Sequence, residues 1–225
     1  MKHCIVNFSD YKFKAGQDRL RESLIKQGYQ GDVILFNEFS EVGSKVHLEV
    51  PYQFKVYAIE KAKEMGYDIV LYCDASLYAI KDVMPVIHHI IENGYLMEFC
   101  GFSVGQFSTD LCLSEFGITR DEAMKIGLHS AGFTGLNFQN ELATNFFDKW
   151  FKSAKQEITF KGDWNNNSKQ CSQDERCLGH RHDQTTASII AYQLEIERIN
   201  PHFMQYAYDG IEIKENTIFN CRGIC

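Results

Sequence analysis

The sequence lacks any cluster of basic residues. Lysine and arginine number 23 against 30 aspartates and glutamates, which leaves a formal net charge of −7. Nucleic acids and anionic membranes are bound through clustered positive charge, so we expect neither as the main partner. A nucleotide ligand is not excluded, because a bound metal ion can supply the positive charge that the chain lacks.

Long apolar runs are missing as well. No stretch approaches the roughly 20 apolar residues of a membrane-spanning helix, so we expect no transmembrane segment. The N-terminus enters a strand-like run at once and has neither the apolar region nor the cleavage site of a signal peptide. The eight cysteines are scattered, and in this context we expect most to be reduced, buried thiols of a cytoplasmic protein.

Internal repeats, low-complexity linkers and a clear domain boundary are also absent from the sequence. A chain of 225 residues with 44% hydrophobic and 24% charged residues can form a substantial core. We therefore expect a single domain over residues 1–225.

Alternating strand and helix patterns predict an α/β fold. Residues 3–8 and 32–36 are typical of strands, and an amphipathic helix from 16 to 27 that Gly28 ends lies between them. Such a β-α-β unit has parallel strands joined by a right-handed crossover. Four more helices are expected: one begins at Pro51, two span about 82–93 and 140–154, and one begins near 183. Further strands are expected at 69–73, 95–99 and 129–138. The order predicts a mostly parallel sheet flanked by helices.

A strand that ends in an acid is the most informative stretch. Residues 69–73 form an apolar, β-favouring run, as in a strand buried on both faces, and Asp74 follows directly. Ligands of open α/β sheets bind at the carboxyl ends of strands. A magnesium or manganese ion on a diphosphate needs only one or two protein carboxylates. Asp74, with the small residues Ala75 and Ser76 beside it, is therefore predicted to bind a metal and a diphosphate. A turn or a helix cap is the alternative.

A second group of chemically active side chains lies before the last helix, in His180-Arg181-His182-Asp183-Gln184. Histidine serves as a metal ligand and an acid–base group, and arginine suits phosphate. The alternative is that Asp183 caps the helix while the other side chains are solvated.

Two further segments each leave two interpretations open. The small residues Ser130, Ala131 and Gly132 allow either a ligand to lie against the backbone or a helix to pack closely on the sheet. Lys55 lies on the helix before the central strand, where its ammonium either reaches a phosphate or is solvated.

Zinc-type ligands occur in the last third of the chain. They are Cys171, Cys177, His180, His182, Cys221 and Cys225. Their spacing fits no standard zinc finger, so a zinc site, a local disulfide and unrelated thiols all stay open.

Taken in order, these motifs resemble the nucleotide-sugar-dependent glycosyltransferases of the GT-A fold. The resemblance rests on the N-terminal β-α-β unit, on residues 54–76 with their Asp-Ala-Ser ending, on Ser-Ala-Gly-Phe-Thr-Gly-Leu-Asn at 130–137, and on His182-Asp183-Gln184. It covers residues 3–195. It implies a Rossmann-like α/β domain in which residues 1–100 bind the nucleotide and residues 101–225 form the acceptor and active-site half.

The resemblance also implies roles for single residues. Asp74 matches the first acid of a D-x-D element that binds metal and diphosphate, and Ser76 stands where the second acid is usual. His182 or His202 is then a candidate for a further metal ligand. Asp183 matches the acid of a D-Q element, either as the base that deprotonates an acceptor hydroxyl or as a contact of the donor sugar.

By the same resemblance, Asn7, Phe8 and Ser9 lie at the usual place of the base and ribose, and the Ser-Ala-Gly segment lies near the donor sugar and acceptor. It implies a Mn²⁺ or Mg²⁺ ion, a nucleotide-sugar donor (a UDP-sugar is expected) and a glycan or other hydroxyl acceptor. Residues 37–52 and 161–180 are expected to be mobile lids.

Two other functions remain as alternatives. A sugar-nucleotidyltransferase usually has a glycine-rich, basic loop after its first strand, and here residues 9–14 contain no glycine. A non-catalytic protein, either a nucleotide-sugar binder or a zinc-stabilised interaction module, is left open by Ser76.

Overall fold

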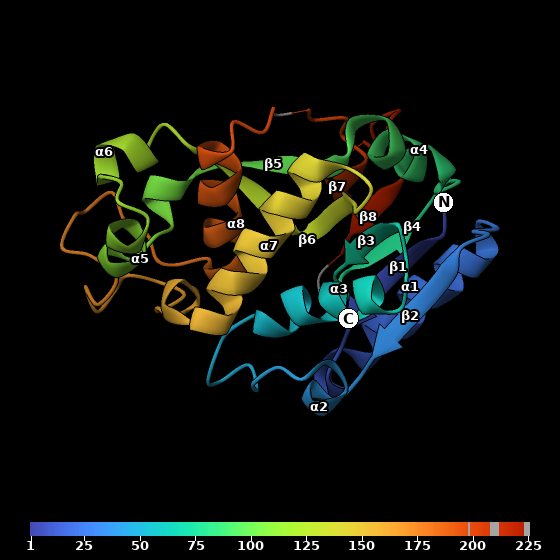
Figure 1. Ribbon diagram of the computed structural model, residues 1–225, viewed down its shortest axis with the longest axis horizontal. Helices are drawn as coiled ribbons and strands as arrows, with labels where there is room; N and C mark the ends of the chain where they lie inside the picture. The colour runs from blue at the N-terminus through green and yellow to red at the C-terminus, as the bar shows by residue number, and fades with distance from the viewer. Residues whose placement is uncertain (198, 208–211, 223–225) are drawn as a thin grey trace.

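The computed structural model describes residues 1–197, 199–207 and 212–222. A five-stranded sheet in the order β2-β1-β3-β6-β5 runs through its centre (Figure 1). These strands are β1 (His3–Phe8), β2 (Asp32–Phe36), β3 (Ile69–Cys73), β5 (Tyr95–Ser103) and β6 (Gly127–Asn137). A smaller sheet in the order β4-β8-β7 consists of β4 (Leu77–Ala79), β7 (Met204–Tyr206) and β8 (Phe219–Cys221).

The helices match the expected pattern and add three short ones. The helices are α1 (Lys14–Lys26), α2 (Phe39–Val42), α3 (Gln53–Glu64), α4 (Met84–Asn93), α5 (Asp110–Glu115), α6 (Arg120–Ala123), α7 (Glu141–Gln156) and α8 (His182–Gln193). The short helices are α2, α5 and α6. Helix α2 lies inside residues 37–52, so part of that expected loop is helical.

Strand directions confirm the expected sheet. Strand β1 pairs in parallel with β2 and with β3, whereas β6 pairs antiparallel with both β3 and β5. Among the described strands of this sheet, β6 alone therefore runs against the other four. The carboxyl ends of β1 and β3 consequently lie at the same edge, where an α/β sheet binds its ligands.

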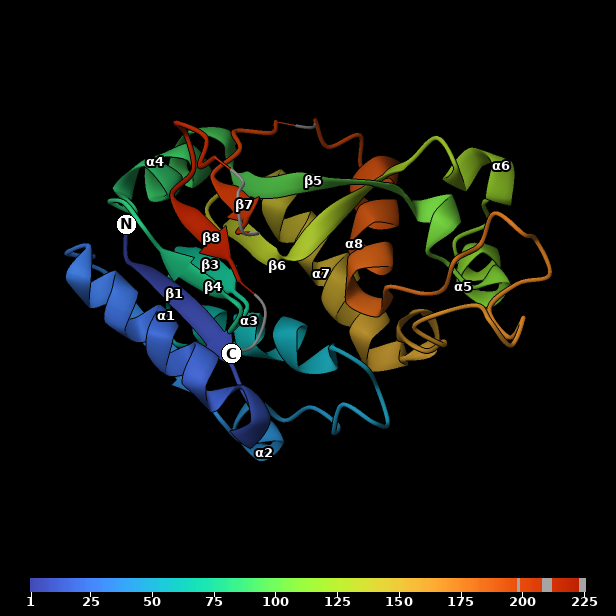
Figure 2. The same ribbon diagram turned by 180° about the vertical axis from the view of Figure 1, so that it is seen from behind.

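Side chains of β1 and β3 alternate between two apolar cores, as the period of a strand requires. On one face, Val6 and Tyr72 pack with residues of α3, α7 and α8. On the other, Ile5 and Leu71 pack with residues of α1 and α4. Figure 2, seen from behind, brings α1 and the smaller sheet to the front. Because both faces are covered, β3 is buried along its whole length, which explains its continuous apolar sequence.

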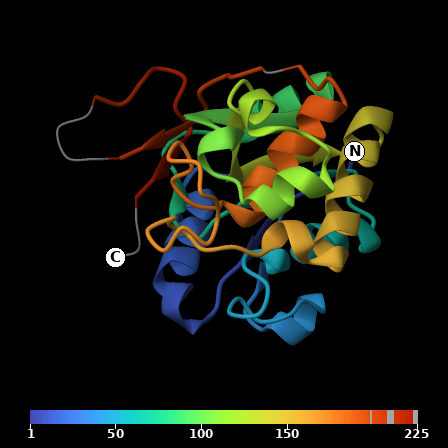
Figure 3. The ribbon, with the colours of Figure 1, turned by 90° about the vertical axis from the view of Figure 1, so that its left-hand side faces the viewer.

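The segment from 161 to 181 contains neither helix nor strand, although all of its residues are described. It is organised by a buried asparagine instead. The Asn166 amide nitrogen donates to the carbonyls of Ser172 and Cys177, and its oxygen accepts the N–H of Cys171. Figure 3 shows this loop (orange) and the C-terminal strands (red) on the same side of the molecule.

The seven cysteines that the structure describes are free thiols, so Cys171 and Cys177 do not form the local disulfide that the sequence left open. Cys225 lies outside the described residues. No described helix combines the length and the apolar character that crossing a bilayer requires. The cytoplasmic location stays a prediction.

Candidate functional site

Asp74 follows β3 at the carboxyl edge of the sheet, as expected. Its N–H donates to the carbonyl of Gly132 on β6 at 2.8 Å. A Cβ atom at position 132 would lie only 2.4 Å from Asp74 Oδ2. The Asp74 carboxylate therefore occupies space that only a glycine leaves free, which gives the small residue of the Ser-Ala-Gly segment a physical role.

Lys55 of α3 extends into the same place. Its Nζ lies 3.0 Å from Asp74 Oδ2 and 3.5 Å from Asp183 Oδ2. Lys55 is only 4% exposed, so the interpretation as a solvated lysine is wrong. Burial alone would lower its pKa, but the carboxylates of Asp183 and Asp74 outweigh this and raise the pKa. A permanently charged ammonium therefore joins the two acids.

Asp183 is the second residue of α8, and Arg181 stands at the N-cap. The interpretation of Asp183 as the helix cap is therefore wrong. Its side chain is buried, and apart from the ion pair with Lys55 its Oδ2 has no hydrogen-bond partner. Burial raises the pKa of Asp183 to about 6, although the ammonium of Lys55 opposes the shift. A carboxyl group that titrates near neutral pH is suited to exchange protons with a substrate.

A cavity of about 220 Å³ opens in front of these charges. Its polar lining consists of Lys55, Asp74, Ser76, Ser130, Arg181, Asp183 and Gln184. Its aromatic walls include Tyr52, Trp164 and Tyr206. We call this the polar cavity.

A second cavity, of about 420 Å³, lies beside the first and shares Tyr52 with it. Its walls are mainly aromatic and include Phe8, Phe39 and Phe54. The Phe8 ring lies 4.9 Å from that of Phe39 and 4.5 Å from that of Phe54. We call this the aromatic cavity; a flat apolar ring fits such walls.

The residues expected at the end of β1 divide between the core and this aromatic cavity. Phe8 and Ser9 line it. Asn7 is fully buried, donates to the Cys73 carbonyl at 2.7 Å and accepts from Gln17 at 2.9 Å. Its amide thus ties β1 to β3 and α1 and is not presented to a ligand in this conformation.

The other small residues also differ in their surroundings. Ser130 and Gly132 line the polar cavity, whereas Ala131 belongs to the core beside α3 and α7. The carbonyl of Ala75 lies 3.5 Å from the guanidinium of Arg19 and would be 2.3 Å from a Cβ at position 16. Ala75 therefore packs against α1.

The proposed metal ligands are not brought together as one set. Ser76 lines the polar cavity with Asp74, and its hydroxyl accepts from the Cys221 thiol. His182 lies outside that lining, and its Nδ1 is 2.9 Å from the Phe160 carbonyl. Burial lowers the pKa of His182 to about 4. His202 is exposed and also lies outside the lining.

Within the described ranges, no three His, Cys, Asp or Glu side chains are grouped as metal ligands. A metal ion that is bound to a diphosphate does not need such a group. Asp74 and the Ser76 hydroxyl suit that mode of binding, because both are oxygen ligands that line the polar cavity.

Tyr52, Trp164 and Tyr206 line the polar cavity but were not identified as site residues from the sequence, and Tyr52 packs against His182 just outside the lining. Tyr52 and His182 carry positive φ angles of 58° and 44°, and their rings lie 5.5 Å apart. Left-handed backbone at bulky residues is costly and concentrates at functional sites. Trp164 packs against both rings. The sequence carries no signal for these conformations, because they depend on contacts between three distant segments.

No family model matches the chain, and no curated protein matches it in sequence. In structure it is similar to mouse xyloside xylosyltransferase 1 in its apo form, with a TM-score of 0.52 and 11% sequence identity. The match covers 98% of this chain and 97% of that one. At this identity the likeness concerns the fold, and it agrees with the α/β GT-A-like fold expected from the motifs.

Proposed function

We propose that this chain is a glycosyltransferase that moves a sugar from a nucleoside-diphosphate sugar, expected to be a UDP-sugar, to a hydroxyl acceptor. The observation that carries the proposal is the charged cluster of buried Lys55, buried Asp183 and partly exposed Asp74 at the carboxyl edge of the sheet. The likeness in fold to a xylosyltransferase supports it. So does the adjoining pair of cavities, one polar and one aromatic.

The two cavities suit the two ends of such a donor. The aromatic cavity would take the nucleobase between its rings, with Phe8 and Ser9 in its wall. The polar cavity would take the diphosphate and the sugar. Lys55 and Arg181 supply positive charge there, and charge that is already in place stabilises a leaving diphosphate most effectively where water is excluded.

Asp74 is the residue that we assign to a Mn²⁺ or Mg²⁺ ion, with the Ser76 hydroxyl beside it. Such an ion would neutralise negative charge on the departing diphosphate. The protein itself contributes by holding the Asp74 carboxylate in place. Lys55 and the space left by Gly132 fix the Asp74 carboxylate where the phosphates would lie.

We assign the role of proton acceptor to Asp183. The acceptor hydroxyl gives its proton to the Asp183 carboxylate, the acceptor oxygen bonds to the anomeric carbon, and the bond from that carbon to the diphosphate oxygen breaks. A carboxyl group with a pKa of about 6 can take a proton from such a hydroxyl as the new bond forms. If Asp183 instead contacts the donor sugar, its replacement weakens donor binding as much as turnover.

Donor binding tests the proposal directly. A thermal-shift panel of UDP-, GDP- and other nucleotide sugars, each with and without Mn²⁺, should identify one donor whose stabilising effect increases with the metal. Asp74→Asn should abolish that increase, because Asn lacks the charge. Asp148→Asn is the matched control, since Asp148 is exposed on α7. No response of the wild type to any nucleotide sugar would reject the proposal.

A further inference from the structure

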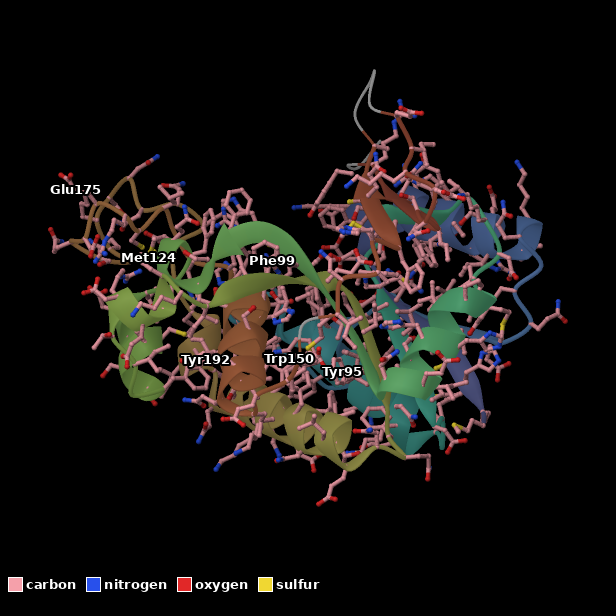
Figure 4. The ribbon with its side chains drawn as sticks, turned by 90° about the horizontal axis from the view of Figure 1, so that it is seen from above. Tyr95, Phe99, Met124, Trp150, Glu175 and Tyr192 are labelled. Carbon is pink, nitrogen blue, oxygen red and sulfur yellow. The ribbon has the colours of Figure 1, made fainter. Side chains whose placement is uncertain are left out.

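Exposed aromatic side chains stand at the mouth of the polar cavity. Trp164, in the 161–181 loop, is 53% exposed, and Tyr206, on β7, is 45% exposed. Both line the cavity. Figure 4 shows the loop, in which Glu175 is labelled, well apart from the C-terminal strands (red). A molecule that enters the cavity can therefore contact both rings.

On the loop side a series of ring contacts leads away from the cavity, and its middle ring, Phe107, is buried with 7% of its surface exposed. The Arg181 guanidinium lies between two rings, with its Cζ 3.8 Å from the ring centroid of Trp164 and 4.0 Å from that of Phe107. Phe107 in turn contacts Phe102 edge to face at 5.2 Å. Phe102, at the outer end of β5, is 48% exposed. We call Trp164, Arg181, Phe107 and Phe102 the aromatic track.

We propose that the aromatic track and Tyr206 bind the acceptor, and that this acceptor is a neutral glycan of at least two sugar residues. The inference rests on the proposed function and adds the substrate class of its second site. The reacting sugar would lie between Trp164 and Tyr206, with a hydroxyl toward Asp183. The next sugar would lie over the outer part of the track, at Phe102.

The chemistry of the surface favours a sugar over other occupants. The face of an aromatic ring is negative and attracts the C–H edges of a pyranose. Gln184 and Ser130 also line the cavity and can form hydrogen bonds to hydroxyls. A lipid or an apolar peptide would instead require an uninterrupted apolar surface, and here the charged Arg181 lies between the rings.

Charge argues for a neutral glycan. The proposed function assigns the charge of Arg181 to the donor diphosphate, and its Nη1 also donates to the carbonyls of Trp164 and His180, so this guanidinium is not left to pair with an anionic acceptor. The chain carries a net charge of −7, which repels polyanions.

The length of the glycan follows from the extent of the track. Three successive contacts, of 3.8, 4.0 and 5.2 Å, separate Trp164 from Phe102. Phe102 is not part of the lining of the polar cavity, so we expect a sugar that reaches Asp183 inside the cavity not to contact Phe102. A monosaccharide should therefore make no contact with Phe102, whereas a longer glycan should contact it.

Trp164 can report this binding itself. The chain has two tryptophans, and the other, Trp150, is fully buried, so a bound sugar should change the emission of Trp164. The probes are neutral xylose-, galactose- and glucose-based saccharides of one to four residues, with dodecyl glycosides and a heparin tetrasaccharide as comparisons. UDP-sugar binding to the same samples is measured in parallel.

We expect at least one neutral oligosaccharide to change the emission saturably. Phe102→Ala should raise the Kd of that oligosaccharide about threefold to tenfold, in line with the value of an aromatic contact, and should not affect the monosaccharide. Phe102→Tyr should restore affinity. Tyr192→Ala, which removes an exposed ring of α8 (labelled in Figure 4), is the matched control and should bind as the wild type does.

The outcomes separate the two proposals. If UDP-sugar binds but no neutral saccharide does, if dodecyl glycosides or heparin bind best, or if Phe102→Ala binds oligosaccharides normally, the acceptor surface is wrong and the glycosyltransferase proposal stands. If saccharides bind as expected but no nucleotide sugar does, the proposed function fails and the acceptor role fails with it.

Discussion

Replacing Lys55 with methionine tests the charged cluster most severely. Methionine keeps the length and flexibility of the lysine side chain but removes the ammonium that lies 3.0 Å from Asp74 and 3.5 Å from Asp183. Two acids then remain side by side, and Asp183 is buried. We expect the free energy of unfolding to fall markedly at pH 8, which lies above the pKa of about 6 of Asp183.

The magnitude follows from the geometry. At an effective dielectric constant near 20, opposite unit charges 3.5 Å apart attract by roughly 5 kcal/mol. Asp74 is partly exposed, with 31% of its side chain accessible, so solvent screens its share. Removal of one partner from a buried ion pair typically costs about 3 to 5 kcal/mol, and we expect Lys55→Met to lie in that range at pH 8.

The loss should depend on pH in a defined direction. The pKa of Asp183 is already raised, from 3.8 to about 6, and loss of the ammonium raises it further. An acid whose folded pKa lies above its unfolded value contributes stability that is complete at low pH and is lost as pH rises through the folded pKa. The variant should therefore approach the wild type at pH 5, where Asp183 binds a proton.

Urea unfolding at pH 5 and pH 8 measures both effects. Lys61→Met is the matched control, because Lys61 lies on the same helix with 38% of its side chain exposed and should change stability by less than about 0.5 kcal/mol. The double variant Lys55→Met/Asp183→Asn should recover much of the loss at pH 8. An equal loss at both pH values, or strict additivity in the double variant, would refute the charged-cluster account.

Two further changes test single contacts. Gly132→Ala should displace the Asp74 carboxylate, since the new Cβ would lie 2.4 Å from Oδ2; we expect a cost of about 1 to 3 kcal/mol in urea unfolding and loss of the Mn²⁺-dependent thermal shift. Glu98 on β5 accepts the N–H groups of Phe203 and Met204, and burial raises its pKa from 4.5 to about 7. The stability that protonated Glu98 contributes is therefore complete below about pH 4.5 and is lost as pH rises through about 7, by about 3 kcal/mol. Glu98→Gln keeps the acceptor oxygen but does not titrate, so it should flatten this part of a plot of Tm against pH. An unchanged slope would contradict the assignment.

The sequence was sufficient for the main strands and for the position of Asp74, because these depend on local patterns. Strand β3 is apolar at every position since both of its faces are covered. The glycine at 132 indicated close approach, and the structure shows what approaches it. The reversal of β6 was not expected, because a strand has the same period in either direction.

Lys55 shows why other parts of the site were not predictable. The sequence left open whether Lys55 is solvated or reaches a phosphate, and the structure shows that it is buried. A lysine is rarely buried unless acidic partners compensate its charge. Here the partners, Asp74 and Asp183, lie 19 and 128 positions later in the chain. Similarly, the aromatic track joins β5 to a loop more than 50 residues away in the sequence, and no local sequence pattern predicts a contact over that separation.

Turnover of a nucleotide sugar tests the central claim most directly. Purified protein is given the donor found in the thermal-shift panel, Mn²⁺ and a neutral oligosaccharide, and both nucleoside diphosphate release and the mass of the glycan are followed. The wild type should release one diphosphate for each sugar that the glycan gains. Asp183→Asn should bind the donor within about twofold of the wild-type Kd yet lose at least about 100-fold in rate, as removal of a general base predicts. A wild type that binds the donor without transferring its sugar to any hydroxyl acceptor, or an Asp183→Asn variant that transfers at the wild-type rate, would contradict the account.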